Sequence, residues 1–346
     1  MFATGLTVEW AAWVAALMAP LHRRSAWRLA HVVLGILLAS GRRTVASWWR
    51  AAGIGESFGS YYYFLGSVGR KATEVATVIC GLLRDRIDPG ERWLLAIDDT
   101  PTKRYGPKVQ GAGVHHNPTP GPTGSKFLYG HSGVVLSRIA HHRHGGTIGL
   151  PLLGRLYIRE DDVPKLPEGI DWAFRTKPQL AAELIAWAGT EVAGHAPQPW
   201  VVVDGTYCNR EFLKPAKRAG LTVVARVRRD ADLCDLPPVL KPGQKRGRGR
   251  PPIYGKGSVS LTKRAGQKRG WHQVRVTTTA GRAVTRMAKT FLATWRPAGG
   301  QGRVVILKEP DGQWRAYLCT DPEASVEAIV QAILDRWAIE QGFADR

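Results

Sequence analysis

Two short apolar runs that each end in a carboxylate constrain the fold more than any other feature of this 346-residue chain. Residues 93–97 (WLLAI) lead directly into Asp98 and Asp99, and residues 200–203 (WVVV) lead into Asp204. Continuous apolar runs of this length are typical of strands buried on both faces of a sheet. Because ligands and catalytic groups collect at the carboxyl ends of such strands, these aspartates are candidate site residues. Taken singly, each is also compatible with a helix cap or a turn.

The residues around these runs predict an α/β protein with helices flanking a sheet. Strand and helix alternate along the chain, which favours parallel neighbours. Strands are expected over 133–141, 150–158 and 221–227, helices over 179–188, 209–219 and 325–344, a hairpin around 310–312 and a loop over 105–131. Glycine and proline are frequent from 228 onward and no helical period persists, which indicates a β-rich insertion. The expected organisation is a helical N-terminal domain over 1–88, the first part of the core over 89–227, the insertion over 228–300 and the end of the core over 301–346.

The helix expected over 325–344 carries a third carboxylate. At 100° per residue, Glu340 falls within the apolar stripe that contains Val326, Ile333 and Trp337. An unpaired carboxylate there would be costly, and Arg336, one turn earlier, can pair with it. A structural salt bridge is one interpretation, and a metal ion shared with the two aspartate segments is the other. Mg²⁺ favours a few carboxylates plus water and phosphate oxygens, and two such ions clamp both oxygens of a phosphoryl transfer.

Basic charge is concentrated in one part of the chain. The sequence has 49 Lys and Arg against 28 Asp and Glu, a net charge of +21, and residues 214–303 account for +19 of it. Such a concentration is the electrostatic footprint of a nucleic-acid contact, whereas a merely soluble surface mixes both signs. A solvated basic face is the alternative interpretation.

Several absences in the sequence predict a cytoplasmic protein. The four cysteines have no spacing typical of a zinc or redox motif, so reduced thiols are expected. The apolar run over 31–40 is too short to cross a bilayer, which argues against a membrane contact. No Gly-Lys-Ser/Thr follows the glycine pairs of the chain, which argues against a nucleotide cofactor.

The three acidic segments together resemble those of bacterial insertion-sequence DDE transposases, the type in which a β-rich insertion interrupts a ribonuclease-H-like core. The resemblance covers roughly residues 35 to 346. In this family the catalytic aspartate of the first strand precedes a threonine, so the resemblance selects Asp99 over Asp98. The segments that carry the resemblance are residues 95–100 (LAIDDT), 201–207 (VVVDGTY) and 335–341 (DRWAIEQ).

The resemblance implies a fold, a reaction and its cofactors. It implies an α/β fold with a ribonuclease-H-like mixed sheet, in which Asp99, Asp204 and Glu340 bind two Mg²⁺ ions, or Mn²⁺, and catalyse the reaction. A metal-bound water would cut a phosphodiester at a transposon end, and the released 3′-hydroxyl would attack target DNA. The implied partners are double-stranded inverted-repeat ends and target DNA, bound by a homodimer associated with the nucleoid.

Basic side chains near the carboxylates and in the insertion are the candidate DNA contacts, and the helices of 1–88 are a candidate DNA-binding domain. Arg336 could orient a phosphate. Residues 245–252 (KRGRGRPP) contain an Arg-Gly-Arg-Pro core similar to an AT-hook, which suits a narrow minor groove. The candidate DNA-contacting residues are Lys103, Arg104, Arg336, Lys245, Arg246, Arg248, Arg250, Lys263, Arg264, Lys268 and Arg269.

The signature around Glu340 departs from the family pattern in two places. Ile333 stands where the family has a tyrosine, and the position of the family's lysine would be 347, beyond the last residue. We therefore expect a C-terminally short copy or a natural variant. Two other functions stay open: a non-catalytic remnant that binds DNA as a repressor, and a ribonuclease-H-like nuclease without strand transfer.

Overall fold

The computed structural model describes residues 2–41, 44–56, 58–86, 92–106, 108–117, 124–142, 146–195, 197–239 and 249–344. The chain divides into two compact units, Met1–Pro89 and Gly90–Arg346, and each has a hydrophobic core of its own. In the part of the chain that is described, no helix is both long and apolar enough to cross a bilayer.

The first unit is helical, as the sequence predicts. Its helices are α1 (Phe2–Met18), α2 (Arg28–Leu38), α3 (Val45–Ala51), α4 (Phe58–Arg70) and α5 (Ala72–Arg86). The core surrounds the fully buried Trp49, which packs with Tyr61 and Phe64. Helices α2 and α3 approach so closely that a Cβ on Gly35 would overlap the carbonyl oxygen of Trp48, so this position requires glycine.

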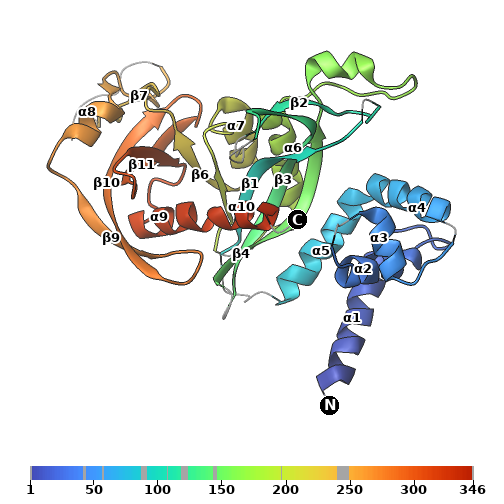
Figure 1. Ribbon diagram of the computed structural model, residues 1–346. Helices are drawn as coiled ribbons and strands as arrows, with labels where there is room; N and C mark the ends of the chain where they lie inside the picture. Colours follow the sequence, from blue (N-terminus) through green and yellow to red (C-terminus); the bar gives the residue numbers. More distant parts are fainter. Residues whose placement is uncertain are drawn as a thin grey trace. The chain divides into compact units, whose positions relative to one another are not determined.

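One mixed sheet forms the second unit and contains the twelve strands found among the described residues (Figure 1). The strand order is β2-β3-β1-β5-β6-β12-β11-β10-β7-β8, with β4 paired to β3 and β9 paired to β10. The strands are β1 (Leu94–Lys103), β2 (Gly113–His116), β3 (Phe127–His142), β4 (Gly146–Tyr157), β5 (Trp200–Val203), β6 (Thr222–Val227), β7 (Leu233–Cys234), β8 (Ser258–Val259), β9 (His272–Thr277), β10 (Ala283–Trp295), β11 (Gly300–Lys308) and β12 (Trp314–Cys319).

The core half of the sheet has the predicted mixed arrangement. Strands β4, β3 and β1 are antiparallel neighbours, and β1, β5 and β6 are parallel neighbours. This strand order is that of a ribonuclease-H-like core, so the predicted fold class is confirmed. The loop expected over 105–131 is partly wrong, because β2 and the start of β3 form a hairpin there.

The basic insertion is β-rich but is not a separate layer. Its strand β10 pairs with β11, and β11 pairs with β12, which closes onto β6 of the core half. The expected hairpin around 310–312 is the β11–β12 hairpin. A short helix, α8 (Leu261–Gly266), interrupts the insertion and was not expected from the sequence.

Helices cover both faces of the core half (Figure 1). Helices α6 (Lys177–Glu191) and α7 (Arg210–Arg218) lie on one face, and α9 (Val326–Asp335) and α10 (Trp337–Ala344) on the other. The sequence predicted a single helix over 325–344. The structure has two helices there, which meet at Arg336, so the prediction is wrong in this respect. Trp337, which was expected in the apolar stripe, is 47% exposed.

Candidate active site

Strand pairing brings two carboxylates together at the carboxyl ends of β1 and β5. Ile97 pairs with Val203 in the parallel ladder, so Asp98 and Asp204 follow at the same level on adjacent strands. Ala96, two residues before Asp98, packs against α10, which shows that this face of β1 is the α10 face. Because side chains alternate along a strand, Asp98 points to the same face.

Arg336 links Asp98 to the third predicted carboxylate. Its Nη1 lies 2.7 Å from Oδ2 of Asp98, and its Nη2 lies 2.9 Å from Oε1 of Glu340. Arg336 stands at the junction between α9 and α10, and Glu340 lies one turn later on α10. The predicted Arg336–Glu340 salt bridge is therefore present, and it extends to the carboxylate on β1.

The surroundings of Asp98 disfavour its charge. Burial raises the pKa of Asp98 to about 6 against the effect of Arg336, and the nearby Asp204 carboxylate adds to the rise. Burial lowers the pKa of Arg336, but Asp98, Glu340 and Asp204 outweigh it, so that pKa lies above its usual value. Negative charge is therefore concentrated here and is balanced by one guanidinium.

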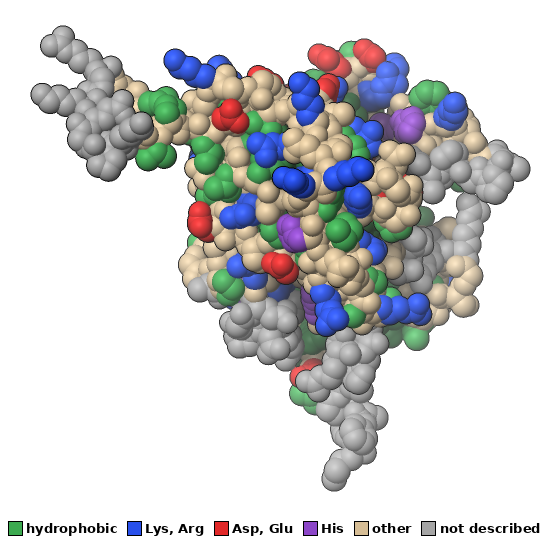
Figure 2. Space-filling model, turned by 90° about the vertical axis from the view of Figure 1, so that its left-hand side faces the viewer, with side chains coloured by type: hydrophobic (Ala, Val, Ile, Leu, Met, Phe, Trp, Pro, Cys, Tyr) green, Lys and Arg blue, Asp and Glu red, His purple; other side chains and the backbone are tan. Residues whose placement is uncertain are grey.

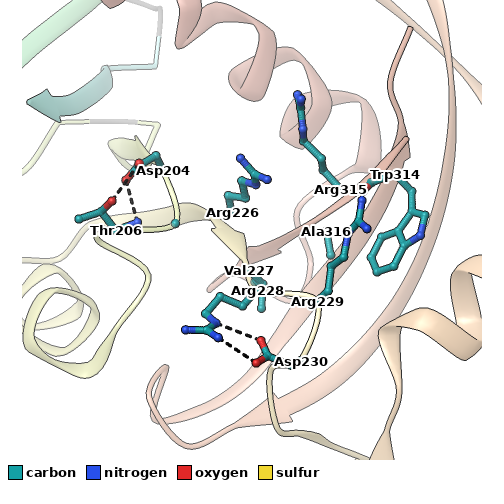
Figure 3. Close-up of a pocket in the computed structure, with 11 residues that line it drawn as sticks. Asp204, Thr206, Arg226, Val227, Arg228, Arg229, Asp230, Trp314, Arg315 and Ala316 are labelled. Atoms are coloured by element: carbon teal, nitrogen blue, oxygen red, sulfur yellow. Dashed lines mark hydrogen bonds and ion pairs between the residues drawn. The ribbon is translucent and has the colours of Figure 1, made fainter. Parts of the chain in front are cut away.

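Asp204 is oriented by its own turn. The backbone N–H of Thr206 donates to Oδ1 of Asp204 at 2.9 Å, and the Thr206 hydroxyl donates to Oδ2 at 3.1 Å (Figure 3). Both bonds leave lone pairs of the carboxylate available, because each oxygen accepts one of them.

Asp99, which the resemblance selects, lies on the opposite face of the sheet. Its Oδ2 is 2.5 Å from Nζ of Lys177 at the start of α6, and its Oδ1 accepts a hydrogen bond from the Tyr207 hydroxyl at 3.4 Å. Burial raises the pKa of Tyr207, so this hydroxyl stays protonated and donates to Asp99. The structure thus groups Asp98, and not Asp99, with Arg336 and Glu340, since neighbouring residues of a strand face opposite ways.

The oxygen atoms of the three carboxylates are of the chemical type that binds a hard divalent cation. Asp98, Asp204 and Glu340 supply carboxylate oxygens, which Mg²⁺ and Mn²⁺ prefer. Among the residues that the structure describes, no three acidic, histidine or cysteine side chains lie close enough together to hold one metal ion. The guanidinium of Arg336 bridges two of the three carboxylates instead.

Asp204 lines two pockets that the sequence did not indicate. The larger, of about 590 Å³, extends over β6 and β12 and includes Arg226, Arg315 and Trp314 (Figure 3). The smaller, of about 130 Å³, includes Arg226, Arg315 and Arg336. The available signal for Arg226 was a charged residue within the strand expected over 221–227, which is otherwise mostly apolar.

A comparison with protein-family models decides the family. The model described as DDE superfamily endonuclease matches residues 16–297, which is more than half of the chain. The chain belongs to the DDE superfamily endonucleases. The match includes Asp98 and Asp204 and ends before Glu340.

The other comparisons with known proteins add little to this assignment. No curated protein matches this DDE superfamily endonuclease. Among solved structures, it is similar to a chain in a cryo-EM structure of the piggyBac transposase synaptic complex with hairpin DNA, with 11% sequence identity and a TM-score of 0.37. The similarity covers 97% of this chain and 58% of that one, so the chain spans little more than half the length of its structural relative.

The predicted DNA contacts of this endonuclease are mostly exposed. Figure 2 shows Lys and Arg side chains spread over the face that carries the insertion. Arg264 is half-buried, with its guanidinium over the ring of Phe291, and Arg336 belongs to the carboxylate group. Exposed in the described structure are Lys103, Arg104, Arg250, Lys263, Lys268 and Arg269, whereas Lys245, Arg246 and Arg248 lie outside the described residues.

Proposed function

We propose that this DDE superfamily endonuclease is a DNA transposase of the bacterial insertion-sequence type, which cuts transposon ends and joins them to target DNA. The observation that supports it is the shared face of Asp98, Asp204 and Glu340 at the carboxyl ends of two parallel strands. Proposed partners are double-stranded transposon ends and target DNA, bound by a homodimer.

The proposed ligands of the two metal ions, Mg²⁺ or Mn²⁺, are Asp98, Asp204 and Glu340. Asp98 replaces Asp99 in this set because Asp99 is paired with Lys177 on the other face. When bound, the ions supply activation of the attacking hydroxyl and neutralisation of the charge on the phosphodiester. Asp204 is held for this task by Thr206.

Arg336 has a second proposed task. In the described structure it neutralises Asp98 and Glu340. Its planar fork of donors also matches the geometry of a phosphate. Metal ions held by these carboxylates would supply the charge that Arg336 now supplies. Arg336 could then orient the scissile phosphate, since it also lines the smaller pocket beside Asp204.

The assignment is tested by comparing Asp98→Asn with Asp99→Asn. The assay is Mn²⁺-dependent nicking of a plasmid that carries the gene with its own flanking DNA. Asp98→Asn should reduce the rate by at least about a hundredfold, because several kcal/mol of transition-state stabilisation is lost. Asp99→Asn should keep most of the rate and lose about 1–3 kcal/mol of folding stability. The reverse result would restore Asp99 to the site.

Strand transfer separates the three possible functions. A transposase joins a pre-cut end with a free 3′-hydroxyl to a target plasmid. A nuclease without strand transfer nicks the plasmid but forms no joined product. A non-catalytic repressor binds the flanking DNA in a salt-dependent way and forms neither product.

A further inference from the structure

We infer that Arg226 is a phosphate-binding subsite, which holds the DNA backbone beside the phosphodiester being cut. The inference rests on the proposed function, because it assumes that the carboxylates of Asp98, Asp204 and Glu340 act on DNA. It adds a binding residue outside the acidic segments and outside the candidate DNA contacts predicted from the sequence.

Arg226 stands in register with the two aspartates. Val203 of β5 pairs with Ala225 of β6, so Arg226 follows on β6 at the level of Asp204, as Asp204 does at the level of Asp98. Val224, two residues earlier, packs in the core beneath α9, so Arg226 points to the face that carries α9 and α10. Adjacent strands lie about 4.8 Å apart, which makes Arg226 the next side chain in this row.

The other arginines of the larger pocket already have partners. Arg228 pairs with Asp230 at 2.9 Å, and Arg315 pairs with Glu309 at 3.2 Å. Arg229 donates to the carbonyl oxygen of Trp314 and lies over its ring at 4.7 Å. Figure 3 shows these side chains around the pocket.

Arg226 differs from them. It is exposed, and within the described residues no carboxylate lies within ion-pair distance of its guanidinium. It lines both pockets that meet at Asp204, so an anion bound to it would lie directly beside the carboxylate group. An unpaired guanidinium offers a bidentate fork to a phosphate.

The ligand class follows from charge and size. The larger pocket, of about 590 Å³, is lined by four arginines and two aspartates, so its lining is positive and selects an anion. A phosphodiester backbone that leaves the carboxylate group across β6 would pass Arg226 within one strand spacing. The carboxylates repel a free anion unless cations are present, which favours a phosphate that is already part of the substrate chain.

Arginine footprinting tests the contact residue by residue. The full chain is treated with phenylglyoxal in Ca²⁺, with and without a duplex of mixed sequence that has a 3′ overhang, and modified arginines are identified by mass spectrometry. The duplex should protect Arg226. The matched control is Arg218, an exposed arginine on α7 over the opposite face, which should react equally in both samples. Equal modification of Arg226 with and without DNA would overturn the inference.

Equilibrium binding by Arg226→Gln and Arg218→Gln provides the second test. Arg226→Gln should weaken binding of the same duplex, and the slope of log K against log salt should fall by about one, since one phosphate contact is lost. Arg218→Gln should change neither quantity. Identical behaviour of the two variants overturns the subsite. A wild-type chain that neither binds nor nicks DNA overturns the proposed function itself, so the two failures are distinguishable.

Discussion

The positive charge of Arg336 neutralises part of the negative charge of Asp98 and Glu340. It stabilises Asp98 and Glu340 at the cost of burying its own charge, with 16% of its side chain exposed. A divalent ion at the proposed metal site would provide more charge at the same place, so it would compete with Arg336 for the same oxygen atoms. The stability of the metal-free protein should therefore depend on Arg336, and the response to metal should too.

Arg336→Gln should lower the free energy of unfolding by about 3 kcal/mol in EDTA, because two partly buried carboxylates lose their counter-charge. Saturating Mn²⁺ should recover more stability in this variant than it adds to the wild type. Urea unfolding in EDTA and in Mn²⁺ measures both values. Arg218→Gln, an exposed arginine on α7 over the opposite face, is the control, whose loss should stay below about 1 kcal/mol with an unchanged Mn²⁺ response. Equal Mn²⁺ stabilisation of Arg336→Gln and wild type would contradict the competition.

The raised pKa of Asp98, about 6 against an ordinary value of 3.8, gives the metal-free protein a specific pH dependence. The folded state holds this proton more tightly than the unfolded chain does, so the group destabilises the fold once it is ionised. Wild type should thus lose about 3 kcal/mol more than Asp98→Asn as the pH rises from about 4 to above 6. Urea midpoints of both proteins in EDTA across this range measure the difference, and parallel profiles would argue against it.

At the scale of elements, the approach of α10 to β4 positions Glu340. A Cβ on Gly149 of β4 would lie 2.8 Å from the carbonyl oxygen of Ala338 and 3.1 Å from Cα of Ile339. Only glycine allows this separation of strand and helix. Glu340 follows two residues after Ala338, so a displacement of the helix displaces the carboxylate.

Gly149→Ala should therefore push α10 outward, cost about 1–3 kcal/mol of stability and reduce Mn²⁺-dependent nicking about tenfold or more. Gly154→Ala on the same strand is the matched control, since its Cβ would make only ordinary contacts, the nearest at 3.5 Å from the carbonyl oxygen of Val134. Thermal unfolding and nicking rates measure both effects. Equal rates for the two variants would show that α10 is not positioned in this way.

The sequence pattern predicted where strands and helices lie better than it predicted the direction in which their side chains point. The apolar runs before Asp98 and Asp204 identified β1 and β5. A buried strand can be recognised from its continuous apolar residues alone, without knowing which strands it pairs with. Which of Asp98 and Asp99 faces α10 depends on the tertiary packing of that helix against β1, which no local pattern contains. Likewise, the helical period placed Trp337 in the apolar stripe, but the residue is 47% exposed, because no local pattern shows which part of a stripe the rest of the protein covers.

At the scale of the whole molecule, each compact unit has a separate core. Trp49 is the centre of the first, whereas the core beneath α9 belongs to the second. Residues 92–346 should therefore fold when expressed alone, with one cooperative unfolding transition and the same Mn²⁺ stabilisation as the full chain. Calorimetry with and without Mn²⁺ tests this, and a fragment without a transition would show that the units depend on each other.

The concentration of basic charge was visible in the sequence, but its structural setting was not. The segment 228–300 was predicted as an insertion because its composition breaks the strand–helix rhythm. Its connection to the core depends on pairing between strands far apart in the sequence, such as β6 with β12, and loop lengths do not determine that pairing. For the same reason Arg226, a neighbour of Asp204 only through the β5–β6 ladder, was not predicted as a site residue.

Strand β6 closes against β12, which the chain supplies only after the basic segment. Val274 and Val276 of β9 share one hydrophobic core with Val224 of β6 and with α9. An exchange of the basic segment between related proteins would therefore have to preserve both its β10–β11 ladder and this core. Variation in the basic segment should then fall on the outward-facing positions of these strands, while the inward-facing positions stay constrained by the fold they support.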